Sequence, residues 1–143
     1  MTLGSDLVSW SSAFFTTAAS LTSDARVKTE VQPLSGGLAT LMQLQPKTYY
    51  KHKSRFVNGV LVLDAAGQSE AGFLAQEMVT VIPTAVYMPK DTTSTLLGVR
   101  YEQVIPYTVE AVQELKAEND ALALRVAKLE QQLAALLALV GTK

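Results

Sequence analysis

The chain has 143 residues, the length of one domain, and its 48% hydrophobic and 17% charged residues are typical of a globular protein. A net charge of -1 argues against nucleic-acid binding through overall positive charge, and the absence of cysteine excludes disulfides, thiolate metal sites and cysteine nucleophiles. His52 is the only histidine, and no apolar run approaches the roughly 20 residues that span a bilayer. We therefore expect no metal site, no cofactor and no membrane partner, and any catalysis would rely on serine, lysine or carboxylates.

Residues 1–22 carry a single charge, Asp6, and are rich in serine, threonine, alanine and aromatic residues. This composition fits the strand-rich end of a larger structure, a segment packed against neighbouring chains, or a tail that becomes disordered when detached. The sequence does not distinguish these three alternatives.

Residues 23–107 contain short apolar runs separated by turn residues, which predicts a compact α+β body. Asn58-Gly59 lies between two apolar or aromatic runs and predicts a hairpin turn. In chain order we expect a helix at 38–44, strands at 49–50 and 60–63, a helix at 74–81, and strands at 86–88 and 96–101.

Residues 108–143 carry a heptad pattern without internal glycine or proline up to Val140, which predicts one helix about 50 Å long. Eight of the nine seam positions are apolar, and Asn119 is the polar exception. The seam consists of Val112, Asn119, Val126, Leu133 and Val140 at position a, with Leu115, Leu122, Leu129 and Leu136 at position d.

A helix with such a seam is expected to oligomerise, because an 80-residue body cannot cover it. Valine at a with leucine at d favours two strands, whereas Leu137 and Leu139 widen the apolar face and favour three or more. The heptads alone leave dimer and trimer open.

Ser23 and Lys28 lie five residues apart at the start of the body. A serine and a lysine can act as nucleophile and base, provided that the lysine is neutral, which requires desolvation or a nearby cation such as Arg26. Five residues along a helix or a strand place the two side chains on different faces, so a turn or a second subunit is needed to bring them together. Spacing alone is weak evidence, and a polar loop with a solvated lysine is the simpler interpretation.

Several blocks of the sequence occur in an order that resembles a known family. They are Ser23-Asp24-Ala25-Arg26-Val27-Lys28-Thr29, residues 44–50, residues 72–77, Ile82-Pro83 and residues 98–102, followed by 110–116 at the start of the heptads. Together they resemble the C-terminal intramolecular chaperone domain of phage tail spikes and fibres, the endosialidase-type self-cleaving family, which also occurs in myelin regulatory factor-like proteins.

The resemblance implies a homotrimer with a C-terminal coiled coil, formed by residues 108–143, that assists the assembly of an upstream fibre and then cuts itself free. Residues 1–22 would be the end of that fibre, and the chain would be a piece of a longer protein. The cut would fall between Thr22 and Ser23, with Ser23 as nucleophile and Lys28 as base of a single-turnover serine peptidase. The partners would be two further copies and the upstream fibre segment, with no nucleic acid and no small-molecule substrate. The domain would act in the host cytoplasm during virion assembly and be absent from, or loosely held by, the mature virion.

Two other groups of residues invite a functional interpretation. Glu77 could orient Arg26 or Lys28, although a structural salt bridge is the favoured interpretation. The cluster Lys47, Lys51, His52, Lys53 and Arg55 could bind phosphate, but a solvated strand edge is favoured.

Two alternatives to self-cleavage come from other classes of protein. A trimerisation module that stays attached to its fibre would share the heptads and cut nothing. The oligomerisation domain of a DNA-binding regulator would need a DNA-binding region, which this chain lacks.

Overall fold

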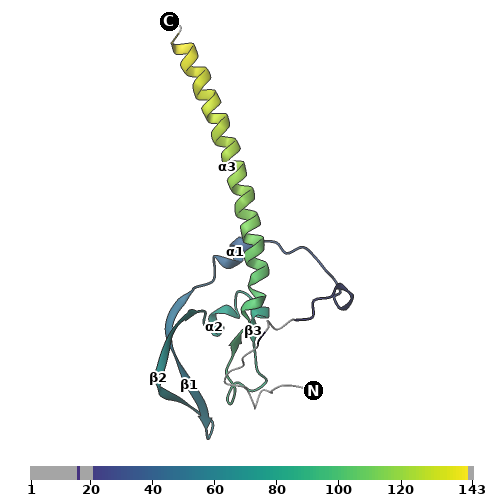
Figure 1. Ribbon diagram of the computed structural model, residues 1–143, viewed down its shortest axis with the longest axis vertical. Coiled ribbons are helices and arrows are strands. Elements are labelled where there is room, and N and C mark those ends of the chain that lie inside the picture. Colours follow the sequence, from purple (N-terminus) through teal and green to yellow (C-terminus); the bar gives the residue numbers. More distant parts are fainter. Residues whose placement is uncertain (1–15, 17–20, 142–143) are drawn as a thin grey trace. The chain divides into compact units, whose positions relative to one another are not determined.

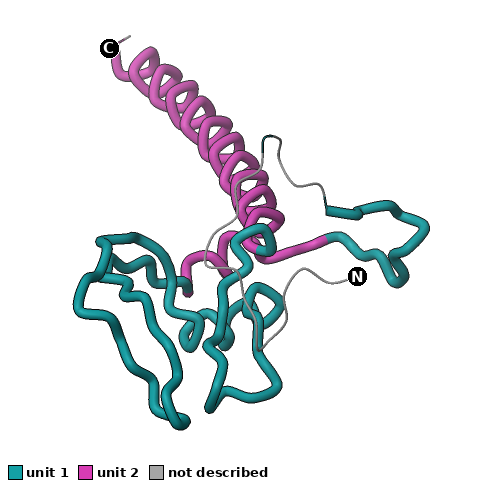
Figure 2. The backbone as a smooth tube through the Cα atoms, turned by 60° about the horizontal axis from the view of Figure 1, so that its bottom comes forward, with its two compact units in different colours: residues 1–33, 44–103 teal, residues 34–43, 104–143 magenta. Residues whose placement is uncertain are grey.

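The computed structural model describes Thr16 and residues 21–141 (Figure 1). The chain divides into two compact units, one of residues 1–33 and 44–103 and the other of residues 34–43 and 104–143 (Figure 2). Short antiparallel strands and a long C-terminal helix confirm the predicted α+β class. The boundaries differ from the expected body of residues 23–107, because residues 34–43 group with the C-terminal helix. The expectations for residues 1–15 and 17–20 lie outside the described residues.

In the first unit, strands β1 (Lys47–Val57) and β2 (Val60–Gly72) form a long antiparallel hairpin (Figure 1). Asn58 and Gly59 form the turn with φ angles of 50° and 77°, values that suit a two-residue hairpin turn. The strands pair from Val57 and Val60 at the turn to Lys47 and Gly72 at the base, with a bulge between His52 and Ser54. The predicted hairpin is confirmed, with both strands longer than expected.

The rest of the first unit consists of short elements around a small core. The buried apolar side chains here are Ala75, Met78, Ile82, Ala85 and Val86. The backbone amide of Arg100 donates to the carbonyl of Ala85 at 2.8 Å and continues the pairing of the last two strands. The elements are η1 (Ala25–Val27), α2 (Ala75–Met78), η2 (Pro83–Ala85), β3 (Val86–Tyr87), β4 (Gly98–Val99) and η3 (Tyr101–Gln103).

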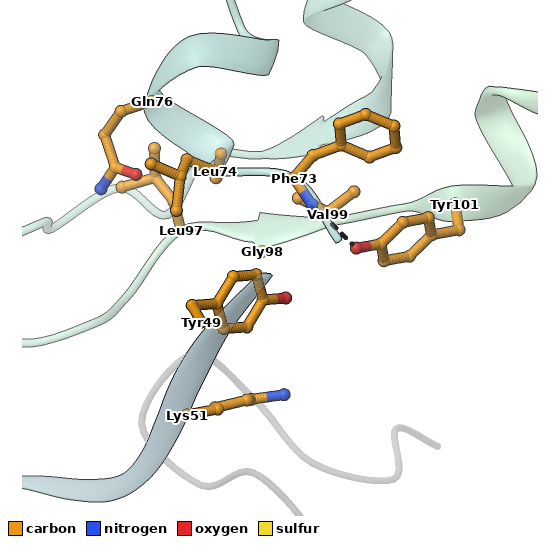
Figure 3. Close-up of a pocket in the computed structure, with 10 residues that line it drawn as sticks. Tyr49, Lys51, Phe73, Leu74, Gln76, Leu97, Gly98, Val99 and Tyr101 are labelled. Carbon is orange, nitrogen blue, oxygen red and sulfur yellow. Dashed lines mark hydrogen bonds between the residues drawn. The ribbon is translucent and has the colours of Figure 1, made fainter. Parts of the chain in front are cut away.

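Two tyrosines meet at the base of the hairpin, where a pocket of about 290 Å³ lies beside them (Figure 3). The Tyr101 hydroxyl accepts a hydrogen bond from the backbone amide of Phe73 at 3.3 Å. The ring centroids of Phe73 and Tyr101 are 6.1 Å apart. Desolvation, together with Tyr101 and Glu70, raises the pKa of Tyr49. A side-chain hydrogen bond also joins Tyr49 to Tyr101. Tyr101 therefore links the end of β2 to the segment after β4.

The second unit contains α1 (Gly37–Leu41) and α3 (Ile105–Val140), which pack against each other (Figure 2). Helix α3 starts three residues before the predicted Thr108, because Pro106 suits the first turn of a helix. Ala111 is buried where α1 lies against α3.

Two carboxylates of α3 hold the start of α1. Glu114 accepts hydrogen bonds from the backbone amides of Gly36 at 3.0 Å and Leu38 at 2.7 Å. Glu110 accepts from the amide of Gly37 at 2.7 Å. The first amides of a helix have no partner within the helix, so the two glutamates supply what α1 lacks at its N-terminus.

The heptad seam of α3 is exposed on the single chain, and its apolar members Val112, Leu122 and Leu133 keep 57–61% of their surface. The fold therefore leaves the whole apolar stripe uncovered, as expected of a helix that associates with other helices. Within the described residues, no helix is long and apolar enough to cross a membrane.

Candidate functional site: a serine and lysine joined across one turn

A single turn of 3₁₀ helix, η1, separates Ser23 from Lys28. The amide of Val27 donates to the carbonyl of Asp24 at 3.2 Å, and the amide of Lys28 donates to the carbonyl of Ala25 at 3.1 Å. This turn shortens the path between the two side chains, which a continuous helix or strand would direct to different faces.

Lys28 Nζ donates a hydrogen bond to Ser23 Oγ at 2.7 Å within one chain. The structure thus brings together the two residues that the sequence analysis singled out, without a second subunit. Both residues are exposed on the single chain, and so is Thr22, whose carbonyl precedes Ser23. The contact is within the range that proton transfer between a nucleophile and a base requires.

Arg26 does not stand beside the lysine as an isolated cation, because it pairs with Asp24. Its Nε lies 3.0 Å and 3.2 Å from the two Asp24 carboxylate oxygens, and its terminal nitrogen lies 2.7 Å from one of them. The hydrogen bonds from Arg26 hold the pKa of Asp24 below its ordinary value, and the same pairing raises the pKa of Arg26.

Glu77 forms an ion pair with Lys47. Among the described residues, no hydrogen bond or ion pair joins Glu77 to Arg26 or Lys28. The structure therefore pairs Glu77 with Lys47 rather than with Arg26 or Lys28.

The basic cluster of β1 is largely paired with acidic neighbours. Lys51 lies 3.5 Å from Glu70, and Arg55 lies 3.0 Å from Asp64. His52 Nδ1 lies 2.9 Å from the backbone carbonyl of Asp64. These partners reduce the positive charge of the strand, and within the described chain no group of three or more acidic or histidine side chains could hold a metal ion.

The sequence analysis assigned no role to Asp24, although its side chain caps the turn that joins the two candidate catalytic residues. An aspartate directly before a short turn is a familiar capping signal, and this signal could have identified it. Glu110 and Glu114 were also missed, and their sequence offers no comparable signal because their partners lie more than 70 residues away.

Fold and site together define an α+β protein with a long C-terminal helix, an uncovered heptad seam and a hydrogen-bonded serine and lysine. Residues 23–87 match the model of the Peptidase S74 family, described as the chaperone of endosialidase. The match begins at Ser23 and confirms the family resemblance for this segment, while the blocks at 98–102 and 110–116 lie beyond it. It supports a chaperone role and a link to a peptidase class. No curated protein matches the chain.

Proposed function

We propose that this chain is an intramolecular chaperone that promotes the trimerisation and folding of an upstream phage tail fibre or spike. It then releases itself by cutting between Thr22 and Ser23. The observation that carries the peptidase part is the 2.7 Å hydrogen bond between Lys28 Nζ and Ser23 Oγ. The family match, which begins at Ser23, supports the chaperone part.

The cut proceeds in two steps. Neutral Lys28 takes the proton of Ser23 Oγ, the oxygen bonds to the carbonyl carbon of Thr22, and the Thr22–Ser23 peptide bond breaks as its nitrogen receives the proton. The product is an ester between Thr22 and the Ser23 hydroxyl. Water then hydrolyses this ester, which yields a new carboxylate on Thr22 and restores the Ser23 hydroxyl at a new N-terminus.

The hydrogen-bond donors that stabilise the oxyanion of the proposed reaction are not the backbone amides of residues 26–28. The amides of Arg26, Val27 and Lys28 already donate to Asp24 and Ala25 oxygens. A backbone N–H from another part of the assembly is the simplest candidate.

Assembly provides the switch for this reaction. Ser23 and Lys28 are exposed on the single chain. Burial in the trimer would favour neutral Lys28, so the cut would report that the fibre has assembled. Because one chain forms the whole serine–lysine pair, neighbouring copies act by excluding water and need not supply the base.

The exposed seam of α3 supports the trimer. Its apolar side chains run from Val112 to Val140 along one helix and keep about half or more of their surface on the single chain. We propose that three parallel copies bury this seam in a coiled coil, in the host cytoplasm during virion assembly. After the cut, the chaperone part would be absent from the mature virion or loosely held by it.

The test is the intact mass of the purified chain, residues 1–143, after oligomer formation. We expect the wild type to lose a fragment of residues 1–22, and Ser23→Ala and Lys28→Met to remain whole because each lacks one of the two groups that move the proton. Matched controls are Ser69→Ala and Lys90→Met, which alter exposed residues of the same types and should cut like the wild type.

An uncut wild-type oligomer would contradict the peptidase assignment and favour a trimerisation module that stays attached to its fibre. A cut at another bond would contradict the assignment of Ser23 as nucleophile.

A further inference from the structure

One carboxylate, that of Asp24, supplies most of the contacts that stabilise the turn between Ser23 and Lys28. The turn has two backbone hydrogen bonds of 3.1 Å and 3.2 Å and no buried residue. A single helical turn is unstable in water by itself, because fixing its backbone costs more than its few hydrogen bonds return. The Asp24 carboxylate adds a hydrogen bond from the Arg26 amide at 2.8 Å and a two-pronged contact with the Arg26 guanidinium.

We propose that Asp24 and Arg26 are a positioning pair for self-cleavage, an inference that rests on the proposed function. Asp24 caps the turn and so keeps Ser23 Oγ within hydrogen-bond distance of Lys28 Nζ. Arg26 engages both carboxylate oxygens and so balances the negative charge of Asp24, which caps the turn four residues before the lysine.

The second role follows from the chemistry of the base. An unpaired carboxylate near a lysine favours the ammonium form, which cannot accept the serine proton. The hydrogen bonds from Arg26 lower the pKa of Asp24, so this carboxylate is ionised throughout the neutral range and its charge must be balanced. The charged groups around the turn are Asp24, Arg26 and Glu30, and no charged side chain of another element contacts Lys28 in the described chain.

The test is the rate of fragment loss as a function of pH in three variants of the full chain. Asp24→Asn keeps an oxygen to cap the turn but leaves Arg26 unbalanced. We therefore expect the cleavage rate to level off at high pH within about twofold of the wild-type plateau. The midpoint of the pH profile should be lower by about half a pH unit. Arg26→Gln leaves the carboxylate unbalanced, and its midpoint should rise by about half a pH unit.

Asp24→Ala removes the cap altogether, so its plateau rate should fall about fivefold to tenfold at every pH. Asp120→Asn is the matched control, because it breaks the exposed ion pair with Lys116 at 2.6 Å on α3 and should change neither midpoint nor plateau. The oligomeric state of each variant is measured alongside, and rates are compared among variants that assemble.

Opposite midpoint shifts in Asp24→Asn and Arg26→Gln would support the pair, since a purely structural role would not move the pH profile in two directions. If the wild type cuts and all three variants share its profile, the inference is wrong while the proposed function stands. If the wild-type oligomer does not cut, the proposed function fails and the inference fails with it.

Discussion

Gly72 allows two tyrosines to meet at the base of the hairpin. A Cβ built on Gly72 would lie 2.6 Å from the Tyr49 hydroxyl and would also collide with the Tyr101 hydroxyl. Both hydroxyls sit at the ends of rigid rings, and the Tyr101 hydroxyl is held by the Phe73 amide. The absence of a side chain at this position is therefore a packing requirement rather than a need for an unusual backbone angle.

Gly72→Ala should destabilise the first unit by about 1–3 kcal/mol, the usual cost of forcing extra volume into a packed site. Chemical denaturation monitored by tyrosine fluorescence measures this change. The double variant Gly72→Ala with Tyr101→Phe removes one of the two colliding hydroxyls, so its loss should be smaller than the sum of the two single losses. Additive losses of stability would show that the methyl group added at residue 72 does not collide with the Tyr101 hydroxyl.

At the level of elements, α1 depends on α3 for its N-terminal partners. It has five residues, fewer than an isolated helix needs to be stable, and its first amides donate to Glu110 and Glu114. Gly37 is the point of closest approach, where a Cβ would lie 2.7 Å from the carbonyl of Tyr107 and 2.8 Å from the amide of Ala111. These are backbone atoms, which cannot move aside as a side chain can.

Gly37→Ala should therefore separate α1 from α3, at a cost of about 1–3 kcal/mol to the second unit. Hydrogen exchange of the Leu38 amide, which donates to Glu114, reports the separation directly. Gly36→Asn is the control, because Gly36 has a φ of 70°, which asparagine tolerates, and a Cβ there would meet nothing within 4 Å. Equal exchange rates in the two variants would argue against the close approach at Gly37.

For the whole molecule, the proposed function requires that the seam of α3 determines whether chains associate and, through association, whether they cut. Leu122 occupies a seam position and keeps 60% of its surface on the single chain, whereas Leu124 lies outside the seam and keeps 74%. The two leucines share one helix and differ mainly in the direction they face, which makes them a matched pair.

Leu122→Asp should prevent assembly, because three carboxylates would meet within the apolar seam, whereas Leu124→Asp should assemble normally. Sedimentation equilibrium should give the mass of a trimer for the wild type and for Leu124→Asp, which is three times 15.4 kDa before the cut, and a single-chain mass for Leu122→Asp. Release of residues 1–22 should be slower in Leu122→Asp than in Leu124→Asp. A single chain that cut as fast as the trimer would contradict the coupling between assembly and cleavage.

The sequence by itself determined the features that rest on local chemistry. Asn58-Gly59 predicted the hairpin because few other residues adopt its turn, and the uninterrupted heptads predicted α3 because their period is that of a helix. The ordered set of blocks that begins at Ser23 also indicated the family whose model matches residues 23–87. The helix begins at Ile105, three residues before the expected Thr108, because proline suits the first turn of a helix.

Only the tertiary structure decided what meets across space. Five residues of spacing left open whether Ser23 and Lys28 touch, and the turn that Asp24 caps brings them to 2.7 Å. The bonds from Glu110 and Glu114 to α1 and the meeting of Tyr101 with Gly72 join distant parts of the sequence. Such contacts form only once a fold brings their segments together, and no periodicity or local propensity encodes them.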